Sequence, residues 1–274
     1  MSMCREKIFD YDRIDEWEPW IDRVVFPIAP AYLAESIAES KPEFIEDAAD
    51  TLFEIVDREE LVACLSSGLH DVRVRVYHGT RLSRVELHDI QENGLRSLRL
   101  TDRKDLLTEI FNDHPEWVAA RSNLDEVLSQ LGRGCKAGLR EDGYIHVCFS
   151  RQGLLSGCNH YLTHGAEVDG HVASMLFQNK ELALRLLQSN REPYLISFLS
   201  DFDSAISAAN PYGFNKSDTP SLMRQIIQSW AFKKYRAEFS SESLLDCTAA
   251  RFTGPKPAQE IERYELVGEI LKVH

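Results

Sequence analysis

The sequence predicts an α+β fold in which a split, mixed β-sheet with helical insertions follows a helical N-terminal segment. Stretches with apolar residues three or four positions apart indicate helices, and shorter stretches with every second residue apolar indicate strands. The insertions between these strands differ in length, which argues against the regular β-helix-β units of a doubly wound parallel sheet. Hydrophobic residues make up 43% and charged residues 27% of the 274 residues, which is typical of a globular protein.

The N-terminal part of the chain, residues 1–70, is expected to be a helical segment. Between residues 15 and 68 apolar side chains recur at helical spacing, and prolines interrupt them. No residues in this segment suggest a chemical role. We therefore expect a cover, lid or partner-binding platform beside a domain that occupies residues 71–274.

The first strand is expected to begin at Val72, from which valines alternate with arginines up to Val76. The sequence predicts that it ends at Tyr77-His78-Gly79-Thr80. The spacing of apolar residues and the position of turn residues predict the later elements as well. They are a helix over 84–92 closed by Asn93-Gly94, a helical insertion over 101–131, a loop over 132–143, a strand over 144–150, a helix over 166–187, a strand over 194–199, a mobile loop over 201–220, a helix or strand over 222–235, a strand over 244–252, a turn over 254–257, a helical turn over 258–261 and a strand over 264–273.

Several classes of protein are excluded by composition. No apolar run reaches the ~18 residues that span a bilayer, and the acidic N-terminus does not resemble a signal peptide, so we expect a cytoplasmic protein without membrane contact. The six cysteines lack the regular spacing of a disulfide scaffold and are expected to be reduced. A net charge of -13 argues against a broad nucleic-acid clamp.

One short run could still contact a nucleic acid or a pyrophosphate, because it mixes aromatic and basic residues. It consists of Trp230, Phe232, Lys233, Lys234, Tyr235 and Arg236. The alternative interpretation is a helix face whose lysines are solvated.

His78 is the first candidate site residue. It is expected where a strand stops and a turn begins, beside Gly79, whose missing side chain would let a ligand approach the backbone. A histidine that only caps the turn fits the same four residues. The continuation Ile90-Gln91-Glu92-Asn93-Gly94-Leu95 adds a short helix that ends in Gly-Leu.

Together these two stretches resemble the first motif of the ADP-ribosyltransferases, an aromatic-His-Gly-Ser/Thr strand end followed by a short helix and Gly-Leu. The later order of segments is similar to the diphtheria-toxin-like and poly(ADP-ribose)-polymerase-like branch: a strand ending in a small hydroxyl residue, a helix, and further strands. The resemblance covers residues 72–273, and its first motif is the specific part. It implies an ADP-ribosyltransferase-like catalytic core that uses NAD as substrate and no metal.

The resemblance also implies residue roles. The residue matching His78 hydrogen-bonds a ribose hydroxyl of NAD, the backbone of Gly79 holds the nicotinamide carboxamide, and Thr80 supports the turn. Tyr77 belongs to the same cofactor-binding motif.

The second family motif is where this sequence departs. One branch expects a tyrosine that stacks on nicotinamide near the strand over 144–150, and this chain offers Phe149 or the later Tyr161. Strand alternation equally allows Phe149 to face the core. Ser150 matches the small hydroxyl of other branches, or it simply caps the end of the strand.

The third family motif is a glutamate at the head of a late strand. Cleavage of the bond between nicotinamide and ribose develops positive charge on the sugar, which a fixed carboxylate stabilises. Glu238 is the first choice, with Glu242 and Glu260 as competitors. Glu260 also fits a cap of the turn before the last strand, and any single glutamate also fits a solvated surface position.

The resemblance implies transfer of ADP-ribose from NAD to a macromolecular acceptor, which could be RNA, DNA or protein. The chain is similar in this respect to the transferase toxins of bacterial toxin-antitoxin and anti-phage defence systems, which implies an inhibitory antitoxin as partner. The alternatives are a non-catalytic interaction protein with the same fold and an enzyme like the tRNA 2'-phosphotransferases.

A zinc-dependent enzyme is a further alternative, because one stretch concentrates metal-capable side chains. They are His146, Cys148, Cys158, His160, His164 and His171. The glutamate expected between the two histidines of a zinc-protease helix is missing. The glycine-rich run over 132–138 lacks the Gly-Lys-Ser/Thr ending of a phosphate loop and is expected to be a linker.

Overall fold

The structure of the protein is a computed structural model that describes residues 7–132, 143–189, 191–210, 219–244 and 249–268. The chain forms two compact units that interleave along the sequence. The first unit comprises Met1–Val76, Cys148–Gly153 and Leu199–Ala250, and the second comprises Tyr77–Val147, Leu154–Phe198 and Arg251–His274. The helices expected over residues 1–70 therefore share a unit with much later segments.

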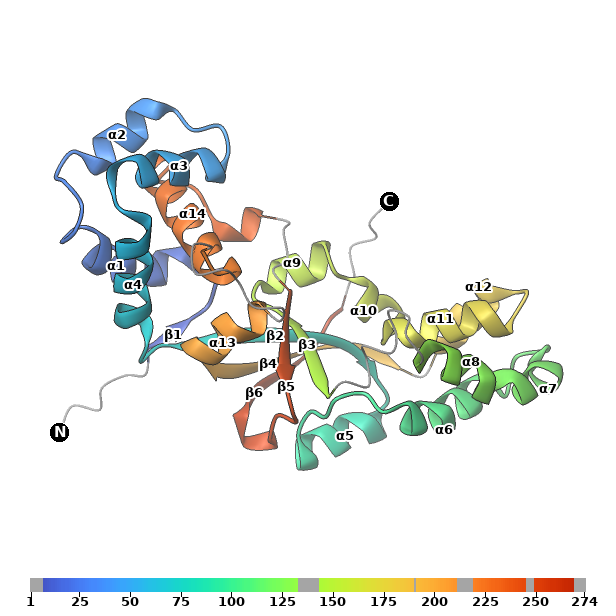
Figure 1. The fold of residues 1–274 in the computed structure, drawn as a ribbon. Coiled ribbons are helices and arrows are strands. Elements are labelled where there is room, and N and C mark those ends of the chain that lie inside the picture. The colour runs from blue at the N-terminus through green and yellow to red at the C-terminus, as the bar shows by residue number, and fades with distance from the viewer. Residues whose placement is uncertain (1–6, 133–142, 190, 211–218, 245–248, 269–274) are drawn as a thin grey trace. The chain divides into compact units, whose positions relative to one another are not determined.

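The described strands form a six-stranded sheet in the order β5-β3-β2-β4-β6, with β1 beside β2 (Figure 1). Their bounds are β1 Ile8–Phe9, β2 Arg73–Leu82, β3 Tyr144–Cys148, β4 Glu192–Asp201, β5 Ala249–Thr253 and β6 Ile261–Leu266. β1 runs parallel to β2, whereas β4 and β6 are antiparallel, with Tyr194 opposite Leu266. The expected α+β class with a mixed sheet is confirmed, and the ADP-ribosyltransferase-like core stays a prediction.

β2 is longer than expected. The predicted strand end at residues 77–80 is wrong, because β2 continues to Leu82, whose side chain is buried. His78 and Gly79 therefore lie within a strand that has β3 on one side and β4 on the other. Pairing along both edges of the strand compensates for the poor strand propensity of a glycine.

The first unit is built around a helix that is buried on several sides. This helix, α14 (Ser221–Tyr235), packs against three of the N-terminal helices, as the orange helix among the blue ones in Figure 1 shows. The N-terminal helices are α1 Ile14–Val25, α2 Leu33–Ser40, α3 Ile45–Ile55 and α4 Arg58–Leu69. The N-terminal residues are therefore largely helical, as predicted, but they share a unit with later segments, so the boundary expected at residue 70 does not coincide with the two units. The region over 222–235 could not be assigned from sequence because a helix buried on several sides lacks a clear apolar stripe.

The loop expected over 201–220 is wrong in its first half. Residues Phe202–Ala209 form α13, and the carboxylate of Asp201 caps it by accepting a hydrogen bond of 2.8 Å from the backbone N–H of Ser204. Phe202 and Ala205 are buried and hold this helix in the first unit. Residues 211–218 lie outside the described part of the chain, as does nearly all of the loop expected over 132–143.

The second unit contains a helical subdomain with its own core. Helices α6, α8, α11 and α12 pack together around buried side chains that include Phe111 and Val172. The helices and short 3-10 helices not yet given are α5 Arg84–Asn93, α6 Leu100–Phe111, α7 Trp117–Ala120, η1 Arg121–Asn123, α8 Leu124–Gly132, α9 Arg151–Ser156, α10 His160–His164, α11 Glu167–Leu176, α12 Lys180–Gln188, η3 Ser241–Ser243 and η4 Ala258–Glu260. The predicted helices over 84–92 and 101–131 are confirmed.

Two later predictions need correction. The single helix expected over 166–187 is two helices, because the side chain of Asn179 accepts from the N–H of Leu182 and starts α12 afresh. The last strand was expected over 264–273, but β6 begins at Ile261, directly after the predicted helical turn.

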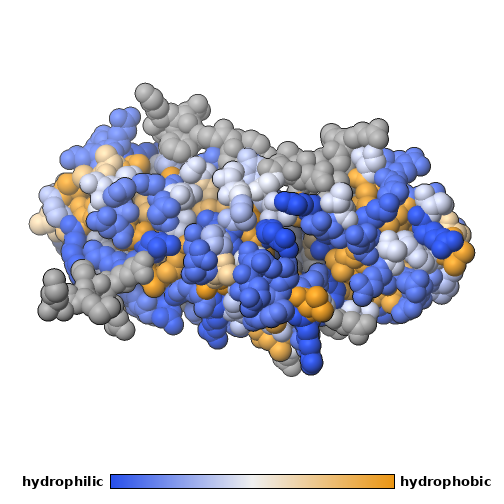
Figure 2. All heavy atoms as spheres, turned by 90° about the horizontal axis from the view of Figure 1, so that it is seen from below, coloured by the Kyte–Doolittle hydropathy of each residue, from blue (hydrophilic) through white to orange (hydrophobic). Residues whose placement is uncertain are grey.

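No helix in the described part of the chain combines the length and the apolar character needed to cross a membrane. The face of the molecule in Figure 2 is largely hydrophilic, with hydrophobic residues scattered among hydrophilic ones. Such scattering is normal for a folded protein and does not mark a binding surface.

Gly94 offers a test of the second unit. It ends α5 with φ 81° and ψ 178°, a conformation that only glycine adopts readily, and a Cβ there would lie 2.2 Å from the backbone oxygen of Lys256. We expect Gly94→Ala to lower the free energy of unfolding by roughly 3 kcal/mol or more, measured by urea denaturation. The matched control is Gly254→Ala, where φ is also positive but no atom lies within 4 Å. It should lose about 1–2 kcal/mol, and equal losses in both variants would contradict the close contact.

Candidate functional site

The second unit holds a cavity of about 610 Å³ between strands β2 and β3 and helix α5. This volume lies within the range of small-molecule sites. The lining residues are His78, Gly79, Thr80, Leu82, Val85, Glu86, Asp89, Ile90, Gly94, Leu95, Arg96, Ser97, Leu98, Arg99, Asp102, Arg103, Tyr144, Ile145, His146, Tyr161 and Ala166. The structure therefore places His78, Gly79 and Thr80 of the first predicted motif at a cavity, together with Tyr161.

His78 is half-buried in the cavity wall and is held by a neighbouring strand. Its Nδ1–H donates a hydrogen bond of 2.8 Å to the backbone carbonyl oxygen of His146 on β3. Burial lowers the pKa of the imidazole below its usual 6.5, and this hydrogen bond opposes the shift only in part. The imidazole is therefore neutral near pH 7, and because Nδ1 carries the proton, Nε2 is left as a hydrogen-bond acceptor.

Gly79 has a different role from the one expected. A Cβ at this position would lie 2.8 Å from Cδ2 of Leu154 and 3.4 Å from Cδ2 of Leu162, so leucine side chains fill the space on that side of the strand. The missing side chain therefore permits close packing of α9 and α10 against β2. The residue still lines the cavity, where the part of it that a ligand can meet is backbone.

Of the two aromatic candidates, only Tyr161 lines the cavity. Its ring lies 4.0 Å from the ring of His160, and Nε2 of His160 is 3.1 Å from a carboxylate oxygen of Glu167. This contact restrains the Tyr161 ring at the cavity wall. Tyr77 is buried beside the motif but is not among the lining residues.

Phe149 and Ser150 belong to the core of the first unit. Phe149 is fully buried, so of its two interpretations the core position is the one found. The hydroxyl oxygen of Ser150 accepts a hydrogen bond of 2.8 Å from the backbone N–H of Gly153 and so caps α9. The expectation that either side chain binds the cofactor is not supported by these contacts.

The three candidate glutamates do not line the cavity. Glu238 belongs to the first unit, precedes no described strand directly and has a side chain that is 80% exposed, 3.6 Å from Arg236. Glu242 is exposed in η3. Glu260 lies in η4, with a carboxylate oxygen 3.8 Å from Nζ of Lys256, as expected for a residue of that turn. The carboxylates that do line the cavity are those of Glu86, Asp89 and Asp102.

Most charged side chains in the cavity wall are held by ion pairs. The pairs are Arg96 with Asp89, Glu86 with Arg191, and Arg103 with Asp169. Asp169 is fully buried, so its charge needs the guanidinium of Arg103, whose Nε lies 3.0 Å away. Glu86 also accepts from the backbone N–H of Ser83, in a capping box that the Ser-x-x-Glu spacing could have revealed.

Two further charged residues line the cavity. Arg99 and Asp102 form no ion pair in the described part of the chain, and both are exposed to solvent at the start of α6. Asp102 accepts a long hydrogen bond of 3.4 Å from the hydroxyl of Thr101, and its charge helps to raise the pKa of the neighbouring Arg103. No sequence pattern marks either residue, because nothing in the sequence brings the start of α6 to the end of the His78 strand.

The aromatic and basic run over 230–236 lies in the first unit, where Trp230 and Phe232 are buried and Arg236 is exposed. Trp230 is fully buried, and its indole N–H donates to Asp22 at 2.8 Å. Lys233 and Lys234 have side chains only 10% and 14% exposed, and they pair with carboxylates of α1. Neither the nucleic-acid surface nor the solvated helix face that we expected is present at these lysines.

Two histidines of the stretch with metal-capable side chains, His160 and His164, form hydrogen bonds with other side chains. Nε2 of His160 pairs with Glu167, and Nδ1 of His164 accepts from the side chain of Gln188 at 3.2 Å. In the part of the chain that the structure describes, no three His, Cys, Asp or Glu side chains form a group that could hold a metal ion. The zinc alternative gains no support from this arrangement. Residues 133–138 of the glycine-rich run lie outside the described residues.

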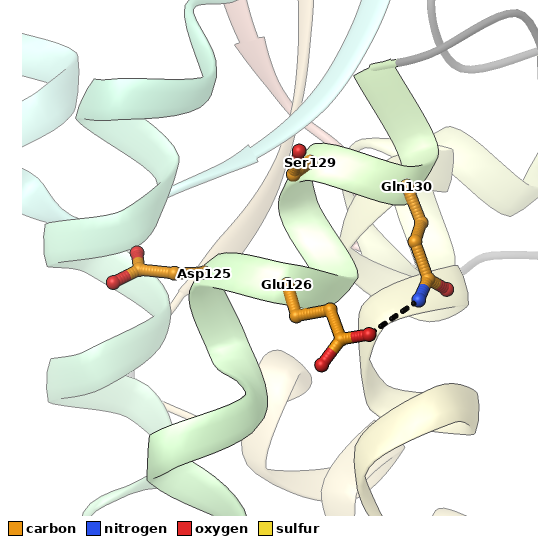
Figure 3. Close-up of a pocket in the computed structure, with 4 residues that line it drawn as sticks. All are labelled: Asp125, Glu126, Ser129 and Gln130. Atoms are coloured by element: carbon orange, nitrogen blue, oxygen red, sulfur yellow. Dashed lines mark hydrogen bonds between the residues drawn. The ribbon is translucent and has the colours of Figure 1, made fainter.

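A second hollow lies along one face of α8 and is less suited to binding. It is lined by Asp125, Glu126, Ser129 and Gln130 (Figure 3). The side-chain N–H of Gln130 donates to Glu126 at 3.1 Å, one helical turn away, and Asp125 pairs with Lys104. These contacts are those of an ordinary helix surface.

Comparisons of the chain with protein-family models, with curated proteins and with solved structures found no match. The resemblance to the ADP-ribosyltransferases therefore rests on the residues of the first motif. The geometry of the cavity must carry any conclusion about function.

The lowered pKa of His78 predicts how stability depends on pH. When the pH falls below about 6.5, the unfolded chain takes up a proton at this position while the folded imidazole stays neutral, so folding loses stability. Urea unfolding at about pH 7.5 and about pH 5.5 should show a larger loss for the wild type than for His78→Gln, which cannot titrate. The same loss in both proteins would contradict the lowered pKa.

Proposed function

We propose that the second unit binds NAD in the cavity beside His78 and transfers ADP-ribose to a macromolecular acceptor. One observation carries the proposal: a neutral, half-buried imidazole, fixed through Nδ1 by a backbone carbonyl, lines a cavity of about 610 Å³. Nε2 of this imidazole is an acceptor that a ribose hydroxyl can satisfy. The ring of Tyr161 and the carboxylate of Asp102, which forms no ion pair within the described residues, also line this cavity.

The reaction makes defined demands on these groups. The bond between C1' of the ribose and the nicotinamide nitrogen breaks, and its electron pair leaves with neutral nicotinamide. The sugar becomes positively charged until a lone pair of the acceptor forms the new bond to C1' and the acceptor loses its proton. A fixed carboxylate close to the sugar stabilises that charge, as in glycoside hydrolysis.

Three side chains divide these tasks in the proposal. His78 orients the ribose through Nε2, and the restrained ring of Tyr161 stacks on the nicotinamide. Asp102 takes the role of the carboxylate that the sequence analysis gave to Glu238, because it lines the cavity, whereas Glu238 does not, and forms no ion pair within the described residues. Gly79 and Thr80 line the cavity beside His78, and the contact with the carboxamide is assigned to Gly79 by the family resemblance alone.

The acceptor and the biological context rest on the family resemblance alone. An effector toxin restrained by an antitoxin remains the expected context. A protein that binds NAD without turning it over, and an enzyme that moves an RNA 2'-phosphate to NAD, are the alternatives.

The test is incubation with NAD labelled in its ADP-ribose part, together with separate pools of protein, RNA and DNA. We expect release of nicotinamide and label on one pool. Binding of NAD without release of nicotinamide identifies the non-catalytic alternative. A reaction that requires RNA with a 2'-phosphate and leaves the RNA unlabelled identifies the phosphotransferase. If NAD neither binds nor reacts, the proposal is wrong.

Asp102 can be tested against Glu238 directly. We expect Asp102→Asn to lower the rate of nicotinamide release about 100- to 1000-fold, because the developing charge on the sugar loses its counter-charge, while NAD binding changes only slightly. Asp125→Asn is the matched control, since that aspartate pairs with Lys104 outside the cavity and should leave the rate unchanged. A large loss in Glu238→Gln, with Asp102→Asn fully active, would return the role to Glu238.

A further inference from the structure

We infer that Arg99 and Ser97, in the segment between α5 and α6, form a phosphate-binding subsite of the same cavity. Both residues line the cavity, and both carry hydrogen-bond donors without a side-chain partner in the described residues. The inference deepens the proposed function, from which it takes NAD as one of its probes. It also names a class of ligand, a nucleoside diphosphate, that can be tested without any turnover of NAD.

Arg99 is singled out by comparison with the two other arginines of the wall. Arg96 is paired with Asp89, and Arg103 neutralises the buried Asp169. Moving either guanidinium toward a ligand would leave a carboxylate without its partner, which is most costly for a fully buried one. Arg99 can turn toward a ligand without this penalty. Its planar guanidinium matches two oxygens of a phosphate.

Ser97 lies two residues before Arg99 in a segment whose start is fixed. Leu95 and Lys256 exchange two backbone hydrogen bonds of 2.8 Å, and the conformation of Gly94 leads directly into that pair. The half-buried hydroxyl of Ser97 is thus carried by an anchored stretch of chain. A donor on an anchored segment loses little conformational entropy when a ligand binds.

The residues that line the cavity differ in what they offer a ligand. His78 and Tyr161 supply a neutral acceptor and an aromatic ring, whereas Arg99 supplies a positive charge. Asp102 follows on the same helix start, so the charged wall is mixed and does not favour a small inorganic anion. A ligand with phosphate for Arg99 and sugar hydroxyls that donate to Asp102 satisfies both charges. A nucleoside diphosphate has this combination.

The experiment is isothermal titration calorimetry of the full chain with ADP, NAD and nicotinamide riboside. We expect Arg99→Gln to weaken ADP and NAD binding about 10- to 100-fold, the effect of losing a charged hydrogen-bond donor, and to leave nicotinamide riboside unchanged. Ser97→Ala should weaken the same two ligands by a smaller factor. The matched control is Arg121→Gln, an exposed arginine of η1 outside the cavity, which should have no effect.

The outcomes separate the inference from the proposed function. If ADP binding depends on Arg99 while NAD is bound and never cleaved, the subsite stands and the transferase reaction does not. If NAD is cleaved and Arg99→Gln binds ADP and NAD as the wild type does, the reaction stands and the subsite is overturned. An equal loss for nicotinamide riboside, or no binding of ADP to the wild type, also overturns the subsite.

Discussion

The hydrogen bond from His78 Nδ1 to the carbonyl of His146 is the contact on which the candidate site depends. A carbonyl oxygen can only accept, so this one contact decides which ring nitrogen carries the proton and leaves the other as an acceptor. It also ties the orientation of the ring to the pairing of β2 with β3. Because burial favours the neutral form, the imidazole offers an acceptor at pH 7 instead of a positive charge.

The charges of the cavity wall follow a second constraint, which is the cost of leaving a buried charge without a partner. Asp169 is fully buried and fixes Arg103, and Arg191, which is also buried, fixes Glu86. These residues are therefore part of the architecture, although they line or adjoin the cavity. The side chains that remain available to a ligand are the exposed ones at the start of α6. A list of the charged residues in the sequence does not distinguish those held in buried ion pairs from those available to a ligand.

The sequence predicted the elements whose burial is one-sided and missed those whose burial is not. Apolar spacing located the N-terminal helices, and the Asn-Gly ending located α5, but α14 is buried on several sides and gave no clear period. The strand end expected at Thr80 failed because a Gly in an interior strand is supported by both neighbours, which local propensity does not report. His78 was found through its motif, whereas Asp102 was not, because the absence of an ion pair is a property of the folded chain.

The net charge of -13 shapes how an anionic ligand can be recognised. The long-range field of the protein repels phosphates, but at physiological ionic strength it is screened over about 8 Å. Within that distance the charges of the cavity lining decide, and Arg99, which forms no ion pair in the described residues, can meet a diphosphate while Asp102 meets a sugar hydroxyl. It is not sufficient for a long phosphate backbone, which would extend beyond the screened distance across an acidic surface. A nucleic-acid acceptor would therefore have to present a short exposed segment, whereas a protein acceptor meets no such restriction.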